Sequence, residues 1–374
     1  MTTRRQFLSR SSLALLGATG TAFALPSETR DSVPDGTASK GMITPEADAA
    51  IARGLQFLSN NQNRENGSFG TLGYKGNTAV TSLAGLAFMA AGHHPGRGAY
   101  GPVVTRALEN VIGHGQRSPR GDFLHNADAT PHGPMYGHGF ATLFLAEVSG
   151  MVPPGMEAAG MLRAGKLRDH VNHMLRKAVD LIIHSQNGEG GWRYYRDSID
   201  ADISVTICQI MALRAARNAG LYVPKSVVDR CVQYVKLCQD RKQGYFRYQK
   251  QGGNDQQAFA RTAAGVCALF AAGIYEGPEI TLGLEYLKRN RNTQQNGWND
   301  MHYFYGHYYA AQAMWTAGGS YWQEWFPWIR DQLIDRQRER SDGSWRDGIC
   351  IHYGTAMACI ILQIPNNYLP IMQK

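Results

Sequence analysis

The chain has 374 residues, enough for one large domain or two ordinary ones, and 43% of them are hydrophobic, which excludes global disorder. The six cysteines lie far apart with no Cys-x-x-Cys pair, which argues against a zinc ribbon, an iron–sulfur run or a small disulfide scaffold. The formal net charge of +8 is scattered along the chain, and no apolar run after the N-terminus is long enough to span a bilayer. We therefore expect no nucleic-acid partner and no transmembrane segment in the mature chain.

The N-terminus has the pattern of an export signal. Arg4 and Arg5 stand one residue before a Phe-Leu pair, and a small, uncharged segment follows that ends in Ala22-Phe23-Ala24. This pattern is typical of a twin-arginine signal peptide, and an ordinary secretory signal is the alternative. We expect residues 1–24 to be a twin-arginine signal peptide, residues 25–42 a flexible leader, and the mature protein periplasmic or secreted.

A glutamine followed by Gly-x-aromatic recurs along the rest of the chain. Five good copies and a degenerate sixth begin at Gln62, Gln116, Gln186, Gln239, Gln337 and Gln294. Their aromatic residues are separated by 47 to 69 residues, and an insertion near residues 151–165 explains the longest interval. Repetition at this period predicts a structure built from several copies of the same supersecondary unit.

Each repeat reads as two helices. The stretch before a glutamine has helical periodicity; Leu167, Val171 and Leu175, for example, share one face. The second stretch is rich in Ala, Gly and Thr, as in residues 78–92, 136–150, 202–220, 259–273, 304–318 and 352–364. Helices that are apolar nearly all round belong to an inner layer, and the charged helices belong outside. We expect an all-α fold over residues 43–368, an α/α toroid of six inner and six outer helices built from six helical hairpins.

The repeated Gln…Gly-x-Trp element resembles that of the terpenoid cyclase and protein prenyltransferase superfamily, above all its squalene–hopene cyclase type. The resemblance covers roughly residues 43–365 and implies an α/α toroid with an apolar small-molecule or isoprenoid ligand. It also implies that the glutamines and aromatics are structural, because the amide can tie helix ends together while the ring stacks on the neighbouring hairpin.

A more local match lies at Asp200-Ala201-Asp202-Ile203-Ser204. It is similar to the Asp-x-Asp-Asp-Thr motif of the cyclases, whose middle aspartate donates the proton that starts cyclisation. The resemblance implies that Asp202 is a general acid with Asp200 as its partner, although Ile203 replaces the third acid. The alternative is that the aspartate only caps a helix. The zinc-binding Cys of the prenyltransferases has no counterpart in this chain, so we expect neither a metal nor another cofactor.

The inner-helix N-termini of a closed toroid converge on one face. Register along the inner helices predicts that several polar or aromatic side chains meet there, and we expect them to bind the ligand: Tyr136, His138, Arg261, Tyr303, Tyr305, His307 and His352. Packing in a core is the alternative for the aromatic residues, and ordinary hydrogen bonding is the alternative for the histidines. An arginine such as Arg261 on an apolar helix needs an anionic partner, either Asp202 or a ligand.

The leading hypothesis is thus an exported toroid that binds, and by general-acid chemistry transforms, an isoprenoid or other apolar ligand. A secreted polysaccharide lyase or hydrolase is the second, because arginine, tyrosine, histidine and a carboxylate also suit an acidic glycan. A non-catalytic scaffold is the third. The tryptophan-rich segment 321–328 is either a seam between helices or a site of peripheral membrane contact, and pairing of Cys208 with Cys267 stays open.

Overall fold

The computed structural model describes residues 37–160, 162–251, 258–292 and 302–373, which belong to one compact unit. The predicted signal peptide, the leader as far as residue 36 and the degenerate repeat at Gln294 lie outside the described residues. Residues 37–42 contact a later helix, because the indole of Trp322 donates to the Ala38 carbonyl and Arg330 to that of Met42. Among the described residues, no helix has the length and apolar character needed to cross a bilayer.

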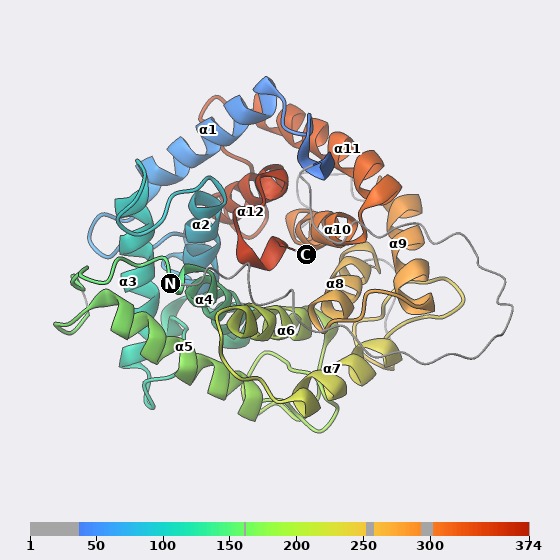
Figure 1. The fold of residues 1–374 in the computed structure, drawn as a ribbon, viewed down its shortest axis with the longest axis horizontal. Helices are drawn as coiled ribbons and strands as arrows, with labels where there is room; N and C mark the ends of the chain where they lie inside the picture. Colours follow the sequence, from blue (N-terminus) through green and yellow to red (C-terminus); the bar gives the residue numbers. More distant parts are fainter. Residues whose placement is uncertain (1–36, 161, 252–257, 293–301, 374) are drawn as a thin grey trace, which may run out of the picture. The chain divides into compact units, whose positions relative to one another are not determined.

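Twelve α-helices make up the described part of the chain, in two concentric rings (Figure 1). The outer helices are α1 (Pro45–Asn61), α3 (Gly101–Arg117), α5 (Leu167–His184), α7 (Lys225–Leu237), α9 (Pro278–Asn290) and α11 (Gly319–Arg338). The inner helices are α2 (Thr78–Ala90), α4 (Pro134–Val148), α6 (Ile203–Asn218), α8 (Ala258–Ala271), α10 (Tyr303–Ala317) and α12 (Ile351–Gln363). Each inner helix packs on the next, and α12 packs on α2, so the ring is closed. The predicted α/α toroid is confirmed.

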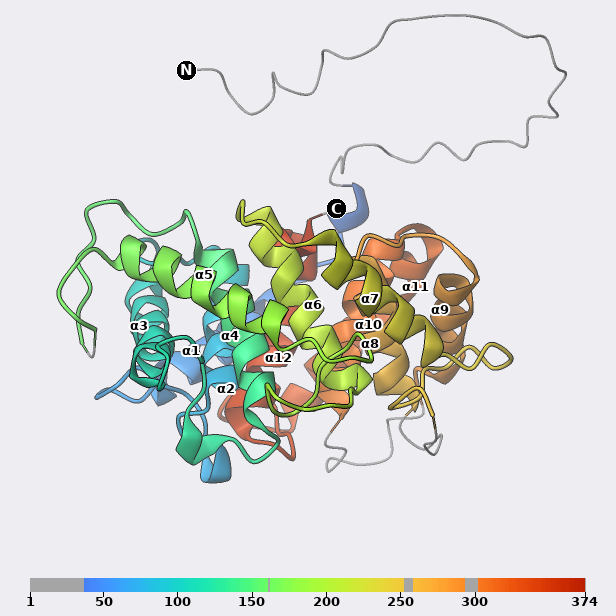
Figure 2. The same ribbon diagram turned by 90° about the horizontal axis from the view of Figure 1, so that it is seen from below.

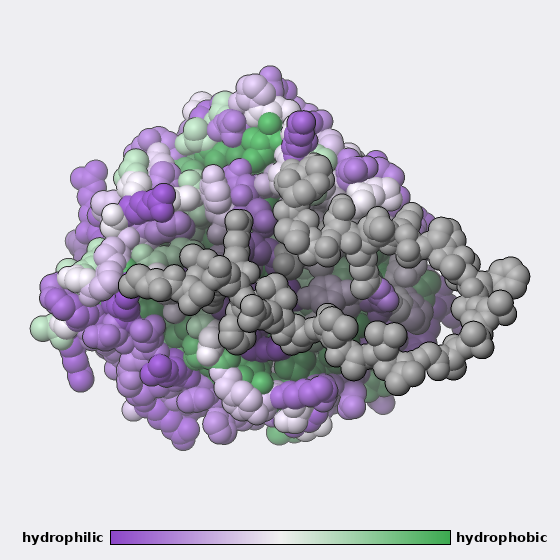
Figure 3. Space-filling view, viewed as in Figure 1, coloured by the Kyte–Doolittle hydropathy of each residue, from purple (hydrophilic) through white to green (hydrophobic). Residues whose placement is uncertain are grey.

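The two rings differ in composition for the reason expected from the sequence. The inner helices are buried almost all round, and their small residues allow close approach: a Cβ added to Gly85 would lie 2.5 Å from the Phe144 ring. The outer helices are amphipathic, and α5 buries the predicted face that contains Leu167, Val171 and Leu175. Figure 2 shows α5 and α7 outside the inner helices, and Figure 3 shows mainly hydrophilic side chains over the outer ring.

The glutamines of the repeat join neighbouring hairpins. The amide of Gln62 donates to the Gly67 carbonyl of its own repeat and to the Val103 carbonyl of the next outer helix, both at 2.9 Å. Gln186 and Gln239 repeat this arrangement. Gln337 does the same between the last repeat and the first, because its amide donates to the carbonyl of Ala50 in α1 at 2.8 Å. Four of the five glutamines therefore have the structural role that the resemblance implied, and one of them closes the ring. Gln116 differs, because its amide contacts His170 Nδ1 at 3.0 Å.

The glycine and aromatic of the repeat have separate roles. Gly67, Gly190, Gly244 and Gly343 have positive φ, and a Cβ on Gly190 would meet the Arg230 carbonyl at 2.5 Å, so only glycine fits there. The aromatic rings are buried, and the backbone N–H of the aromatic donates to a threonine of the following inner helix in four repeats, as from Trp192 to Thr206 at 3.1 Å. The sequence pattern did not reveal this threonine.

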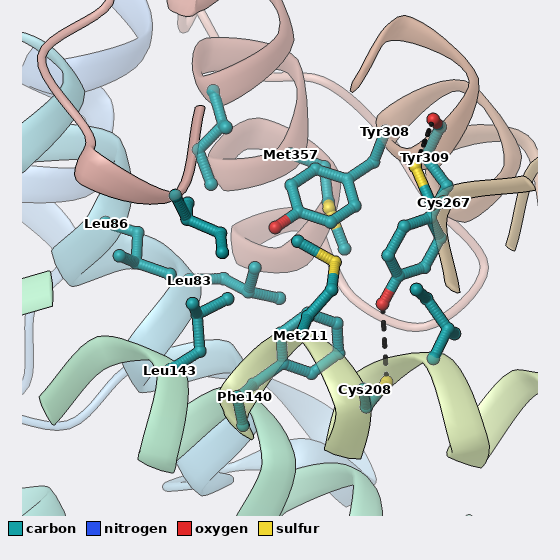
Figure 4. Close-up of a cluster of buried hydrophobic side chains, with 14 of the residues drawn as sticks. Leu83, Leu86, Phe140, Leu143, Cys208, Met211, Cys267, Tyr308, Tyr309 and Met357 are labelled. Carbon is teal, nitrogen blue, oxygen red and sulfur yellow. Dashed lines mark hydrogen bonds between the residues drawn. The ribbon is translucent and has the colours of Figure 1, made fainter. Parts of the chain in front are cut away.

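Side chains fill the middle of the ring (Figure 4). Leu83, Phe140, Met211 and Met357 meet there, and Tyr309 lies between two thiols: its hydroxyl is 3.3 Å from Cys208 Sγ, and its carbonyl accepts from Cys267 Sγ at 3.0 Å. These two cysteines are free, as are the other four. The C-terminal segment lies over the centre of the ring in Figure 1, and the Ile371 N–H donates to buried Glu147 at 3.1 Å. Open space remains at the N-terminal ends of the inner helices.

Candidate functional site

A cavity of about 650 Å³ lies at the N-terminal ends of the inner helices. This volume suits a small-molecule ligand, since such sites span roughly 300–1,000 Å³. Its polar lining comes mainly from six tyrosines, two arginines and two histidines: Tyr74, Tyr136, Tyr194, Tyr248, Tyr305, Tyr353, Arg193, Arg261, His132 and His302. Apolar side chains such as Val80, Phe140 and Ile349 complete the wall. Of the residues described, no Asp or Glu lines the cavity.

The fold assembles this cavity from residues that are distant in sequence. Each inner helix contributes its first turn or the loop before it, so the wall contains side chains from all six hairpins. Tyr136 of α4, Arg261 of α8 and Tyr305 of α10 line the cavity, as register along the inner helices predicted. Tyr194 and Tyr248 were not predicted, although each stands two residues after the aromatic of its repeat, a periodic signal that could have found them.

Asp202 lies at the start of α6 and is fully buried. Its Oδ1 accepts a hydrogen bond from the Val205 N–H at 2.8 Å, which is an N-cap, while Oδ2 has no hydrogen-bond partner among the described residues. Burial raises the pKa of this carboxyl to about 6, against the lowering effects of the Val205 N–H, the Arg193 charge and the nearby Tyr248 hydroxyl. The capping role of Oδ1 and a proton on Asp202 below about pH 6 are therefore compatible.

Tyrosines separate Asp202 from the cavity. The residue is absent from the described lining, but the carboxyl is close enough to Tyr136, Tyr248 and Tyr305 to help burial raise their pKa values. The Tyr248 hydroxyl is also hydrogen-bonded to that of Tyr194. The three tyrosines beside the Asp202 carboxyl therefore line the cavity themselves.

Asp200 occupies a different environment from Asp202. Its half-buried carboxylate forms an ion pair with Arg193 and accepts from the Gln249 amide at 3.2 Å. Asp200 is thus paired with the Arg193 guanidinium, whereas the resemblance implied that it is the partner of Asp202. Arg193 itself lines the cavity, so Asp200 acts on the site by positioning this cation.

Two of the histidines that we expected to bind the ligand form hydrogen bonds with backbone groups instead. His138 Nδ1 accepts from the Leu124 N–H at 3.1 Å, and Nε2 lies 3.0 Å from the Ala178 carbonyl. His352 Nδ1 accepts from the Gly70 N–H at 2.8 Å. Burial lowers the pKa of both imidazoles to about 4, so both are neutral. Neither residue is in the described cavity lining; each fixes a loop that leads toward an inner helix.

Tyr303 and His307 lie on the side of α10 that faces α8 and α11. The His307 ring is 4.5 Å from that of Tyr303 and 5.0 Å from that of Phe259, and burial lowers the pKa of His307 to about 3. Tyr305 lies two residues from both Tyr303 and His307, so its side chain is on the opposite side of α10, where it lines the cavity. Trp322, Trp325 and Phe326 of α11 are also buried here, which is the arrangement of a packing seam.

Comparison with known proteins shows the fold. No model of a protein family matches the sequence, and no curated protein matches it significantly. The type II terpene cyclase MstE from Scytonema, in complex with its substrate geranylgeranyl dihydroxybenzoate, is a structural neighbour with a TM-score of 0.57 and 14% identity over 87% of this chain and 98% of the cyclase. The fold implied by the cyclase resemblance is therefore confirmed.

Two sugar-active enzymes share the same fold. Cellobiose 2-epimerase from Bacillus thermoamylovorans has a TM-score of 0.59 and 10% identity over 86% of this chain and 99% of the epimerase. An inactive variant of an α-1,6-mannanase from Salegentibacter, in complex with α-1,6-mannotriose, has a TM-score of 0.57 and 8% identity over 86% of this chain and 99% of the mannanase. The fold alone does not distinguish isoprenoid from sugar chemistry.

Proposed function

We propose that this protein binds an isoprenoid or other elongated apolar ligand in the central cavity and acts on it as an acid catalyst. The observation that carries the proposal is Asp202, a fully buried carboxyl whose pKa is raised to about 6 directly behind the cavity wall. With this pKa the carboxyl is half protonated near pH 6 and keeps its proton in more acidic solution, where it is suited to general-acid catalysis. The aromatic and apolar wall suits a hydrocarbon chain, and the fold is shared with a cyclase whose substrate contains a geranylgeranyl group.

The geometry favours a proton path through Tyr248. In this path the Tyr248 hydroxyl gives its proton to the ligand and takes the Asp202 proton, so that Asp202 ends as a carboxylate. The Val205 N–H and the Arg193 charge stabilise that carboxylate, because both lower its pKa. Return of one proton from the reacted ligand along the same path restores the acid. A phenol is a weak acid, so we expect the proton to go to an oxygen of the ligand more readily than to a simple alkene.

The test compares Asp202→Asn with wild type on named probes: geranylgeraniol, its terminal epoxide and squalene. Asparagine keeps the N-cap acceptor but has no acidic proton to transfer, so the variant should bind the probes with unchanged affinity and form no product. Asp197→Asn, which removes an exposed carboxylate from the preceding loop, is the matched control and should behave as wild type. Failure of all three probes to bind, or equal product formation by Asp202→Asn, would refute the proposal.

A second candidate function is cleavage of an acidic polysaccharide. It is favoured by the two arginines and six tyrosine hydroxyls of the cavity, since arginine can bind a uronate and tyrosine can exchange its proton. The epimerase and the mannanase support it as sugar-active proteins with this fold. Incubation with alginate or polygalacturonate, followed by ultraviolet absorbance of unsaturated products, distinguishes it from the first function. The third hypothesis, a non-catalytic scaffold, is less favoured than these two functions, because a scaffold has no need of an open cavity of about 650 Å³.

We also propose export by the twin-arginine pathway, which rests on Arg4 and Arg5 and the alanines that precede the expected cleavage point. Changing both arginines to lysine should leave the precursor in the cytoplasm. Cell fractionation and the N-terminal sequence of the exported form test this. Normal export of the double-lysine variant would instead indicate the ordinary secretory route.

A further inference from the structure

The turn of the second repeat is seated differently from the turns of four other repeats. In the first, third, fourth and last repeats, a Cβ added to the glycine would lie 2.4 to 3.0 Å from a carbonyl oxygen of the next outer helix. Gly121 also has positive φ, but a Cβ there would meet only Lys177 Nζ of α5, at 3.4 Å. The amide of Gln116 likewise contacts the His170 side chain, where the other four glutamines bind a backbone carbonyl. A gap is therefore left between this turn and α5.

A second cavity, of about 530 Å³, lies in this gap. The turn, α5 and the loop after Trp192 line it, and it shares no lining residue with the central cavity. Six charged side chains surround it, three of each sign: Arg120, Asp122, Lys177, Asp180, Arg196 and Asp197. Among the described residues none of the six has an ion-pair partner, whereas Lys225 and Asp229 on α7 pair at 2.6 Å. Equal numbers of opposite charges thus face one space without pairing.

The deeper charges of this second cavity belong to Asp122, Lys177 and Arg196, which are partly buried. Lys177 approaches Gly121, and the Arg196 guanidinium lies 5.9 Å from the centre of the Phe123 ring. The two cations thus lie beside the residues that precede and follow Asp122 in the turn. Oδ1 of Asp122 is itself buried and has no hydrogen-bond partner among the described residues. A buried acceptor without a donor is costly, which points to a ligand that supplies the donor.

We propose that the second cavity binds a small zwitterion, of the class of short peptides with both ends free. The carboxylate of the ligand pairs with Lys177 and Arg196, and its ammonium group donates to Asp122 Oδ1. Charge-assisted hydrogen bonds of this kind are stronger than those between neutral groups. The volume lies in the range of small-molecule sites, so a dipeptide has room.

A zwitterion fits the second cavity better than an acidic sugar does. The charges of the wall cancel, so a ligand with a negative charge alone would be attracted by three side chains and repelled by three. A zwitterion offers each sign a partner. The exposed charges of Arg120, Asp180 and Asp197 stand at the edge of the cavity, outside the contacts proposed for the ligand. This site does not depend on the reaction proposed for the central cavity.

The experiment is isothermal titration of the full-length protein with alanylalanine and with two forms of it that lack one charge. N-acetyl-alanylalanine has no ammonium group, and alanylalanine amide has no carboxylate. Each of the two should bind about tenfold more weakly than alanylalanine or worse, because one charge-assisted contact is lost. Galacturonic acid, which is the acidic-sugar probe, should bind as weakly as the N-acetyl form.

Two variants assign the two ends of the ligand. Asp122→Asn should weaken alanylalanine about tenfold and leave the N-acetyl form unchanged, whereas Lys177→Met should weaken both and leave the amide unchanged. The matched control is Lys225→Met, which removes an exposed lysine from α7 and should bind all probes as wild type does.

Three results would overturn the proposal, once circular dichroism shows that all the proteins are folded. The first is wild type that binds no alanylalanine at millimolar concentration. The second is equal affinity for alanylalanine and either the N-acetyl form or galacturonic acid, which would indicate an anion site. The third is loss of binding in Lys225→Met to the same extent as in Lys177→Met.

Discussion

Replacing Asp202 with asparagine should stabilise the protein at pH 8 and leave its stability unchanged near pH 4. In the folded protein the carboxyl binds its proton more tightly than in the unfolded chain, because burial disfavours the charge. Its contribution to stability is therefore complete below about pH 4 and is lost as the pH rises through about 6. A pKa of about 6, against an ordinary value of 3.8, corresponds to a loss of about 3 kcal/mol by pH 8.

The assay is urea unfolding of wild type and Asp202→Asn, followed by far-ultraviolet circular dichroism at several pH values from 4 to 8. The difference in unfolding free energy should grow from near zero to about 3 kcal/mol in favour of the variant, with its midpoint between the two pKa values. Asp197→Asn should stay within about 0.5 kcal/mol of wild type throughout, since this carboxylate is exposed. A variant that is less stable than wild type at pH 8 would show that the folded protein accommodates ionised Asp202 well and does not raise its pKa.

Three further substitutions test the fold. Gln337→Ala removes the two hydrogen bonds that the amide donates to the Ala50 and Gly343 carbonyls and the acceptor of Arg53, so urea unfolding should show a loss of about 2–4 kcal/mol, whereas Gln373→Ala at the exposed C-terminus should have little effect. Leu72→Asn should raise stability by about 0.5–1 kcal/mol, because it relieves a left-handed leucine; a loss would mean that the side chain packs. Glu147→Gln should match wild type near pH 4 and exceed it by several kcal/mol above pH 8, since burial raises the pKa of Glu147 to about 8; equal stability at pH 9 would contradict this.

The comparison of His307 with Tyr305 shows why some site residues were predicted and others were not. Both lie in the aromatic run at the start of α10, and both were expected at the cavity. A helix turns by about 100° per residue, so two side chains that are two positions apart lie on nearly opposite faces. Composition could not tell which face looks inward, since α10 is apolar on all sides. Only packing against α8 and α11 decided that Tyr305 reaches the cavity while His307 is buried in the seam.

Periodicity determined the architecture of this protein from the sequence alone. The glutamine, glycine and aromatic perform the same local tasks in the repeats that begin at Gln62, Gln186, Gln239 and Gln337, so the pattern indicates the hairpins and their division into two rings. The cavity is different, because its wall takes a side chain or two from each hairpin and no local pattern records which neighbours they meet. The burial that raises the Asp202 pKa and the pairing of Asp200 with Arg193 are products of long-range packing, which only the tertiary structure specifies.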